Sequence, residues 1–188
     1  MKYKFIGKEI CYTGKELAPH WIYKNHDIAG EAIVGFIGEC DVKTSDMADI
    51  SDVLSNSPIY SKKMLHFIVE HFNIPLIEGV LRQRLLINIF REYLMDNGIS
   101  PVLLSRNGDD LFYKDRKLSV SIAAKSVNSV LIHLGVNIDP AGAPVKAAGL
   151  ETDLNFENFM KIGEDVMCSY IKECDEIVHA SCKVKGIL

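Results

Sequence analysis

The sequence predicts a single α+β domain spanning residues 1–188, with a mixed, mainly antiparallel sheet and helices packed largely on one face. Strand-like runs gather before residue 42 and after residue 101, and helical patterns fill the region between them. Segregation of strands and helices along a chain is typical of α+β folds. A chain of 188 residues with 48% hydrophobic residues can bury one sizeable core.

The N-terminal third is predicted to supply strands and a long loop. Residues 2–12 and 20–23 each carry clustered apolar side chains, and 32–37 is a continuous apolar run typical of a buried strand. The segment 43–63 lacks clear periodicity and contains Asp46, Asp49 and Asp52. A polar loop of this length is usually functional or mobile.

Helices are predicted in the middle and at the end of the chain. Apolar residues at helical spacing predict a helix over 61–72, and Pro75 then indicates an extended link over 75–80. The strongest helical pattern covers 81–96 and stops at Asn97-Gly98. A last helix is expected to start at Asp153-Leu154-Asn155, and the tail 180–188 is a candidate for a final strand.

Residues 102–139 form the stretch around which the fold is organised. Apolar runs at 102–104, 111–113, 118–124 and 130–137 are separated by turn candidates at 106–108, 114–116 and 127–129. This alternation predicts a meander of antiparallel strands. An exposed edge of such a meander also allows a homodimer.

Composition excludes several classes of protein. The net charge of −4 does not favour wholesale nucleic-acid binding. We expect no secretory leader, because no sufficiently long apolar run follows residues 1–4, and we expect no membrane span, because no segment reaches the required length. Five scattered cysteines favour reduced thiols and a cytoplasmic location. Neither their spacing nor that of the histidines predicts a metal site.

Polar side chains at the strand ends of 102–139 are the candidates for ligand binding. They are Arg106, Gly108, Asp109, Asp110, Lys117 and Asn137. Charged groups held at the ends of rigid strands are well placed for a ligand. Each also has a structural reading: a solvated charge for Lys117, a turn for Gly108 and the acidic pair, a surface ion pair for Arg106, and a buried amide satisfied by the backbone for Asn137.

The segment from Asp109 to Ser119 resembles the biotin protein ligases, in which an Asn-Asp-hydrophobic stretch and a short hairpin precede Lys-Leu-Ala/Ser-Gly. Leu134-Gly135-Val136-Asn137-Ile138 is similar to the Gly-Ile-Asn-Val strand of biotin and lipoate ligases. The whole chain resembles the mostly archaeal domain of unknown function 366 family, placed in the same superfamily with its class II synthetase-like core.

The resemblance implies a function for these residues. Lys117 matches the ligase lysine that contacts the acid carboxylate and the α-phosphate of ATP, so it is the candidate catalytic residue; a fixed cation there stabilises charge in the transition state. Asp110 would hold Mg²⁺ or orient Lys117. The implied partners are a small carboxylic acid or its acyl-adenylate, ATP with Mg²⁺, and a carrier protein as acceptor.

The sequence also departs from the ligase pattern. Asp109 replaces asparagine, Val120 stands where the family has glycine, and no Gly-Arg-rich phosphate loop is present. The region that would supply this loop is acidic. An acyltransferase or acyl-adenylate-forming ligase therefore remains the first hypothesis, with a non-catalytic ligand- or nucleotide-binding module on the same fold as the alternative. The position of the loop 43–63 relative to Lys117 distinguishes the two.

Overall fold

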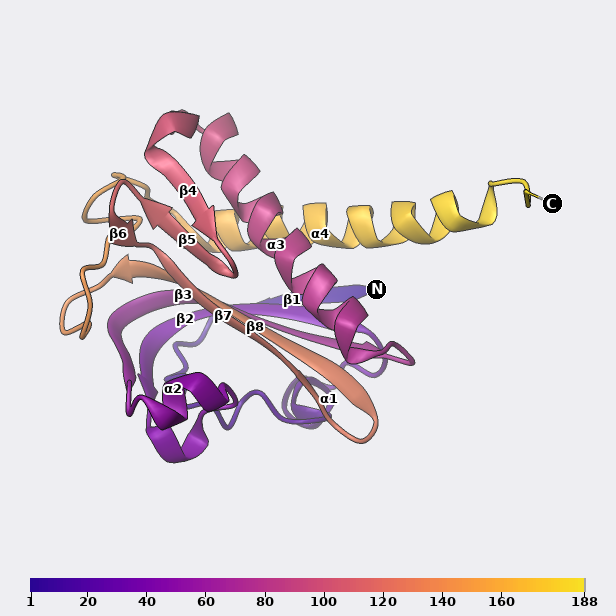
Figure 1. The fold of residues 1–188 in the computed structure, drawn as a ribbon, viewed down its shortest axis with the longest axis horizontal. Helices are drawn as coiled ribbons and strands as arrows, with labels where there is room; N and C mark the ends of the chain where they lie inside the picture. The colour runs from indigo at the N-terminus through magenta and orange to yellow at the C-terminus, as the bar shows by residue number, and fades with distance from the viewer. Residues whose placement is uncertain (188) are drawn as a thin grey trace.

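The computed structural model describes residues 1–187, and it contains two sheets and two long helices (Figure 1). The larger sheet has the strand order β1-β2-β3-β8-β7. Its strands are β1 (Lys2–Ile6), β2 (Ala32–Val42), β3 (Ile59–Phe72), β8 (Ser129–Asp139) and β7 (Ser119–Lys125). Only β1 and β2 are parallel, so the predicted mixed, mainly antiparallel sheet is confirmed.

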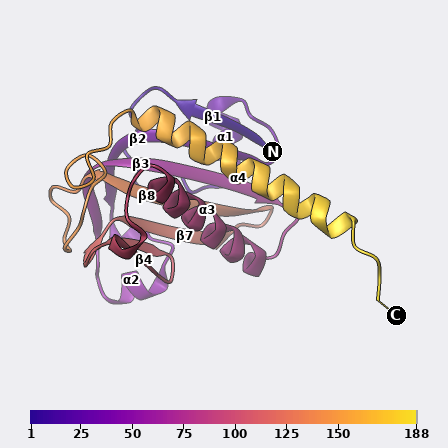
Figure 2. The ribbon, with the colours of Figure 1, turned by 90° about the horizontal axis from the view of Figure 1, so that it is seen from above.

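The helices α3 (Leu76–Asp96) and α4 (Phe159–Cys182) lie side by side over one face of this sheet (Figure 2). They pack on the apolar side chains that alternate along β3 and β8, such as Leu65, Phe67, Ile132 and Leu134. This arrangement confirms the prediction that helices pack largely on one face. No helix within residues 1–187 combines the length and the hydropathy that crossing a bilayer requires.

The opposite face of the large sheet is covered mainly by irregular chain (Figure 1). The segment 7–31 contains the short helix α1 (Trp21–His26), and 43–58 contains the 3₁₀ turn η1 (Thr44–Asp46) and the helix α2 (Ile50–Leu54). A second apolar cluster lies beneath this cover and includes Ile22, Val34, Phe36 and Met64.

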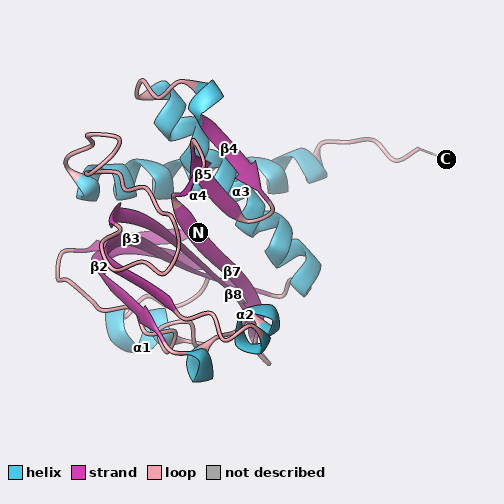
Figure 3. Cartoon of the chain, turned by 60° about the vertical axis from the view of Figure 1, so that its left-hand side comes forward, coloured by secondary structure: helices cyan, strands magenta, loops and turns pink. Residues whose placement is uncertain are grey.

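The predicted meander is divided between two sheets. A 3₁₀ turn, η2 (Pro101–Leu103), precedes β4 (Leu104–Asn107), which pairs with β5 (Asp110–Tyr113) and β6 (Arg116–Lys117) in a separate three-stranded sheet beside α3 (Figure 3). The chain then enters the large sheet as the hairpin β7–β8. Leu118 lies between β6 and β7, where the chain passes from the small sheet to the large one, and it is fully buried. The first strand of the meander, predicted over 102–104, is wrong at its start, because Val102 is exposed and belongs to η2, and β4 begins only at Leu104.

The helix predicted over 61–72 is wrong, because this segment is the central strand β3. Leu65, Phe67 and Val69 face the long helices, whereas Met64, His66 and Ile68 face the other side, and all six are buried. A strand buried on both faces carries apolar residues on both faces, so its periodicity cannot distinguish it from a buried helix.

Other boundaries also differ from the predictions. The strand candidate at 20–23 is wrong, because His20 is the N-cap of α1 and residues 21–23 are helical, with Ile22 buried. The loop predicted over 43–63 ends earlier, since β3 begins at Ile59. Helix α3 starts directly after Pro75, which needs no N–H donor in that position. Helix α4 starts at Phe159, where the side chain of Asn158 accepts a hydrogen bond from Lys161 N. Residues 180–187 form no strand, and Leu188 lies outside the described residues.

Candidate functional site

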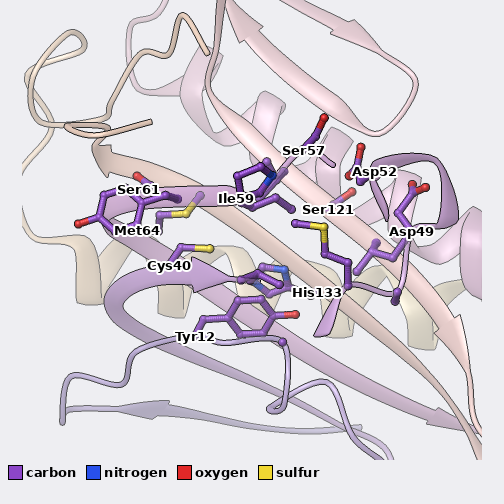
Figure 4. Close-up of a pocket in the computed structure, with 18 of the residues that line it drawn as sticks. Tyr12, Cys40, Asp49, Asp52, Ser57, Ile59, Ser61, Met64, Ser121 and His133 are labelled. Atoms are coloured by element: carbon purple, nitrogen blue, oxygen red, sulfur yellow. The ribbon is translucent and has the colours of Figure 1, made fainter. Parts of the chain in front are cut away.

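A cavity of about 590 Å³ lies between the irregular cover and the β7–β8 end of the large sheet (Figure 4). This volume is in the range of small-molecule sites. Three parts of the chain that are far apart in sequence line it: the segments around Tyr12 and Cys40, the segment 43–61, and the strand ends at 109–147. Apolar side chains such as Met64, Val120 and Val145 make up much of the wall.

Lys117 lines this cavity and is held firmly by its backbone. Its N–H donates to Lys146 O at 2.9 Å, and its carbonyl accepts from Ala148 N at 3.0 Å. The side-chain amide of Asn137 also donates to Lys117 O at 3.2 Å. Asn137 itself lines the cavity and is 6% exposed. Strand β8 therefore helps to fix the position of Lys117 through the side-chain amide of Asn137, one of the residues that the sequence analysis selected.

The ammonium group of Lys117 forms an ion pair with Asp110, with Nζ and Oδ2 2.8 Å apart. Burial raises the pKa of the Asp110 carboxyl, and the charges of Asp109 and Asp52 raise it further, although the hydrogen bond from Lys117 opposes them. Both partners line the cavity and keep about a quarter to a third of their side-chain surface, 30% for Lys117 and 26% for Asp110. A ligand can therefore reach the pair.

Asp109 also lines the cavity, but its own contacts are structural. Its carboxylate accepts from Gln83 Nε2 at 3.2 Å and lies 3.6 Å from Arg84 NH2. Its carbonyl accepts from Ser121 Oγ at 3.1 Å. These contacts join α3 and β7 to the hairpin that carries Asp110, so Asp109 positions its neighbour.

Arg106 and Gly108 do not line the cavity. The guanidinium of Arg106 donates to the carbonyl of Gly108 across the β4–β5 turn, and Arg106 is exposed. Gly108 has a left-handed backbone at φ 61°, which suits a turn glycine. Of the predicted ligand-binding residues, the structure brings together Asp109, Asp110, Lys117 and Asn137, and it leaves Arg106 and Gly108 on the hairpin.

The segment 43–58 folds over the cavity rather than away from it. Asp46, Asp49 and Asp52 all line the space that Lys117 faces, and Asp52 is close enough to Asp110 to raise its pKa. Asp49 also accepts a hydrogen bond from Ser51 N at 2.7 Å as the N-cap of α2. Five aspartates thus line a cavity in which Lys117 is the only lysine or arginine of the described residues. Within residues 1–187, no three His, Cys, Asp or Glu side chains gather closely enough to hold a metal ion.

The floor of the cavity contains aromatic and histidine side chains that the sequence did not single out. His133 on β8 stacks on Tyr12, with ring centroids 3.7 Å apart and planes inclined by 10°. His66 on β3 lies behind His133 and is fully buried. The signal was present in the sequence, because His133 and Asn137 are the two polar residues of the otherwise apolar run 130–138. A polar side chain inside a buried run needs a hydrogen-bond partner.

Cys40 is a second buried group in the cavity wall. It is fully buried, and burial raises the pKa of its thiol to about 12. The thiol is therefore protonated at neutral pH, whereas the nucleophilic form of cysteine is the thiolate. Cys40 accordingly acts as a small apolar residue where β2 passes beneath the cavity.

A separate polar network lies on the helix face of the sheet. His71 Nε2 and Tyr170 Oη are 2.9 Å apart, and His71 Nδ1 lies 3.4 Å from Glu31 and 3.3 Å from Arg82. Arg82 also forms an ion pair with Glu78 in α3. This network ties α3 and α4 to β3 and does not reach the cavity.

The comparisons with known proteins agree with this fold. A family model described as a domain of unknown function, DUF366, matches residues 1–185. An uncharacterized protein of Methanocaldococcus jannaschii is 40% identical over 179 residues, which cover 92% of this chain and 79% of that protein. A solved protein of unknown function from Pyrococcus horikoshi is 33% identical, with a TM-score of 0.90 over 99% of this chain and all of that one.

Two structures with much lower identity share the fold. The biotin protein ligase of Leishmania major, solved with biotinyl-5-AMP, has a TM-score of 0.60 at 13% identity and covers 100% of this chain and 85% of its own. A T. acidophilum protein named as a lipoate protein ligase candidate, solved with lipoic acid, has a TM-score of 0.59 at 11% identity over 92% of this chain and 85% of its own. The fold predicted from the sequence motifs is therefore confirmed.

Proposed function

Because this chain belongs to the DUF366 family and has the fold of biotin and lipoate protein ligases, we propose that it binds a small carboxylic acid or an activated acyl derivative and transfers the acyl group to an acceptor. The acceptor would be an amine on a carrier protein. A free acid would first be activated by ATP, its carboxylate oxygen bonding to the α-phosphorus as pyrophosphate leaves. In the transfer from the activated derivative, the acceptor nitrogen forms a bond to the acyl carbon, the leaving group departs with its electron pair, and the amine proton is released.

The observation that supports this function is the position of Lys117. It is the only lysine or arginine among the described residues that line the cavity, and strand contacts on both sides hold its backbone. In acyl transfer, negative charge develops on the acyl oxygen, and a fixed cation stabilises that charge. Lys117 can supply this stabilisation whether the acyl group arrives as an adenylate or as another activated ester.

Asp110 has a defined part in this proposal. Its ion pair with Lys117 holds the ammonium group in one position before a ligand binds. Because its pKa is raised, the Asp110 carboxylate takes up a proton more readily than an ordinary aspartate does. A ligand carboxylate can therefore replace Asp110 beside Lys117 at a smaller cost in free energy. Lys117 is thereby oriented without being permanently masked.

The test is thermal stability of the pure protein with biotin, lipoate, octanoate, their adenylates and Mg²⁺-ATP. A ligand at about 100 times its dissociation constant adds about 2.7 kcal/mol of stability, which corresponds to several degrees for a domain of this size. We expect a shift with at least one acid or adenylate, and we expect it to disappear in Lys117→Ala. Lys125→Ala removes the same charge from the exposed end of β7 and serves as the matched control.

If the ligand still raises the unfolding temperature of Lys117→Ala, Lys117 does not contact the ligand. No shift with any acid or adenylate would contradict the acyl-transfer function as a whole. A positive result is followed by mass spectrometry of candidate carrier proteins for the added acyl mass.

The excess of carboxylates favours a second candidate function, a binding module for a ligand that carries positive charge. Five aspartates against one lysine make the cavity wall acidic, which disfavours a bare anion and favours a cationic group. Stabilisation by a primary amine such as octylamine, which replaces the carboxylate of octanoate with an ammonium group, but by no acid or adenylate, would support this second function.

A further inference from the structure

His133 and His66 form a hydrogen-bonded pair in the floor of the cavity, and the acyl-transfer function gives them no role. His66 Nδ1 and His133 Nε2 are 3.1 Å apart, and His66 Nε2 lies 3.3 Å from Gly38 O. Both rings are on the face of the sheet opposite to α3 and α4, because His133 and His66 alternate with the residues that pack on those helices.

The contacts of this pair fix which nitrogen atoms carry protons. Gly38 O can only accept, so His66 Nε2 carries the proton that it donates. His66 is neutral, because burial lowers its pKa to about 4, and its Nδ1 is therefore an acceptor. His133 Nε2 must then donate to His66. Burial also holds the pKa of His133 well below 6.5, so the remaining nitrogen, His133 Nδ1, is an unprotonated acceptor.

His133 Nδ1 has no protein partner among the described residues. Within residues 1–187, the only fully buried side-chain nitrogen or oxygen atom without a partner is His26 Nε2, so His133 Nδ1 keeps some accessible surface. The ring lines the cavity, and Figure 4 shows it above Tyr12. Stacking on Tyr12 holds its plane, and Gly135 leaves room beside it, because an added Cβ would lie 3.2 Å from His133 Cε1.

We propose that His133 Nδ1 is a specificity determinant, which accepts a hydrogen bond from an N–H or O–H group at the buried end of the ligand. This inference rests on the proposed function, because it assigns the two ends of one ligand to two ends of the cavity. Asn137, which holds Lys117, and His133 are four residues apart on the same face of β8, roughly 13 Å along the strand. The ligand is then an acid whose carboxyl end lies at Lys117 and whose far end carries a hydrogen-bond donor.

His66 acts through His133 as a positioning residue. It locks His133 in the tautomer that presents a bare nitrogen to the cavity. In His66→Phe, which retains a flat ring of similar size, His133 is free to move its proton to Nδ1. We expect that variant to lose the preference for ligands with an N–H or O–H group at the buried end, while it still binds the carboxyl end of the ligand.

The first measurement uses the wild-type protein with ¹⁵N-labelled histidine and requires no variant. Long-range ¹H–¹⁵N correlation spectra should show His66 and His133 as Nε2–H tautomers at pH 7.5. Adding 1-hexanol should shift the His133 Nδ1 resonance, whereas 1-methoxypentane, of similar size without the O–H, should not. A protonated His133 Nδ1, or equal shifts with both probes, would overturn the assignment.

The second measurement compares the affinities of 8-hydroxyoctanoate and octanoate, which differ only by a terminal hydroxyl. We expect the hydroxy acid to bind about three- to tenfold more tightly, as one hydrogen bond contributes. In His133→Leu the preference should reverse, because the hydroxyl is then buried without a partner. Equal affinities in the wild type would contradict the inference.

The two proposals fail in different ways. If the acyl-transfer function is wrong, neither acid binds in a manner that depends on Lys117, yet 1-hexanol still shifts His133 Nδ1. If the role of His133 is wrong, both acids bind with equal affinity and still depend on Lys117.

Discussion

Asp110 shows how a single residue of the site affects the stability of the whole protein. Its pKa lies above the ordinary value of 3.8, so the native state binds its proton more tightly than the unfolded state does. The ionised carboxylate therefore lowers the free energy of unfolding as the pH rises above 3.8, and below that pH the penalty is absent. Such a cost is typical of groups kept for a function.

We predict that Asp110→Asn is more favourable to stability, relative to the wild type, at pH 7 than near pH 3.8. The amide cannot ionise, so the pH-dependent penalty disappears. Urea unfolding of both proteins at the two pH values measures this difference. Asp115→Asn, in the exposed turn of the same hairpin, is the control and should show much less change with pH. An Asp110→Asn difference that does not vary with pH would contradict the raised pKa.

His66 predicts the opposite dependence at mildly acidic pH. Its pKa of about 4 lies below the ordinary 6.5, so the unfolded state binds the proton first as the pH falls. The contribution is fully present above pH 6.5 and is lost as the pH falls towards 4. We expect this group alone to remove about 2–3 kcal/mol of the free energy of unfolding between pH 7.5 and pH 4.5.

Urea unfolding of His66→Phe at these two pH values tests this prediction. The variant should lose less stability on acidification than the wild type does. His179→Phe, which removes an exposed histidine from α4, should keep the wild-type dependence. Equal pH dependence in wild type and His66→Phe would show that His66 is not buried in its neutral form.

At the scale of the elements, β2 and the segment 7–12 depend on a close approach at Gly38. A Cβ at this position would overlap the carbonyl group of Ile10, which lies in the neighbouring segment 7–12. Ile10 N donates to Ile37 O at 3.0 Å, and Tyr12 N donates to Glu39 O at 2.8 Å, so the segment cannot move away without losing these bonds. The carbonyl oxygen of Gly38 also accepts the hydrogen bond that orients His66.

We predict that Gly38→Ala lowers the free energy of unfolding by about 1–3 kcal/mol, the usual cost of forcing extra atoms into a packed site. Gly7→Ala is the control, because nothing lies within 4 Å of a Cβ there. Chemical denaturation measures both. A Gly38→Ala variant as stable as Gly7→Ala would show that residues 7–12 are not held against β2 in solution.

The elements also show where sequence patterns succeed and fail. The hairpin β7–β8 was predictable, because alternating side chains and a Ser-Val-Asn-Ser turn are local signals. The strand β3 was not, because burial on both faces leaves no alternation. The break between β6 and β7 was also invisible, since it depends on Leu118 being buried between the two sheets.

At the scale of the whole molecule, the cavity exists only because three distant segments meet. Its cover, 43–58, contains α2, which has no buried residue, so this segment should open at low cost in free energy. We predict that backbone amides of 43–57 exchange with solvent faster than those of β3 and β8. An acid that stabilises the protein should slow exchange in 43–57, whereas the exposed end of α4 serves as the internal reference. Protection confined to β8 would show that the segment 43–57 does not contact the ligand.

The sequence by itself determined the fold class, the family and four of the residues that line the cavity. Each depends on short-range information: the strand and helix patterns, the spacing from Asp109 and Asp110 to Lys117, and the Gly-Val-Asn strand that contains Asn137. Only the tertiary structure decided that Arg106 stays on its hairpin, that the acidic segment covers the cavity, and that His133 stands in its floor. These depend on which strand neighbours which, and on the face to which each side chain points. Pairing between β3 and β8 joins residues more than fifty positions apart, and no local pattern specifies it.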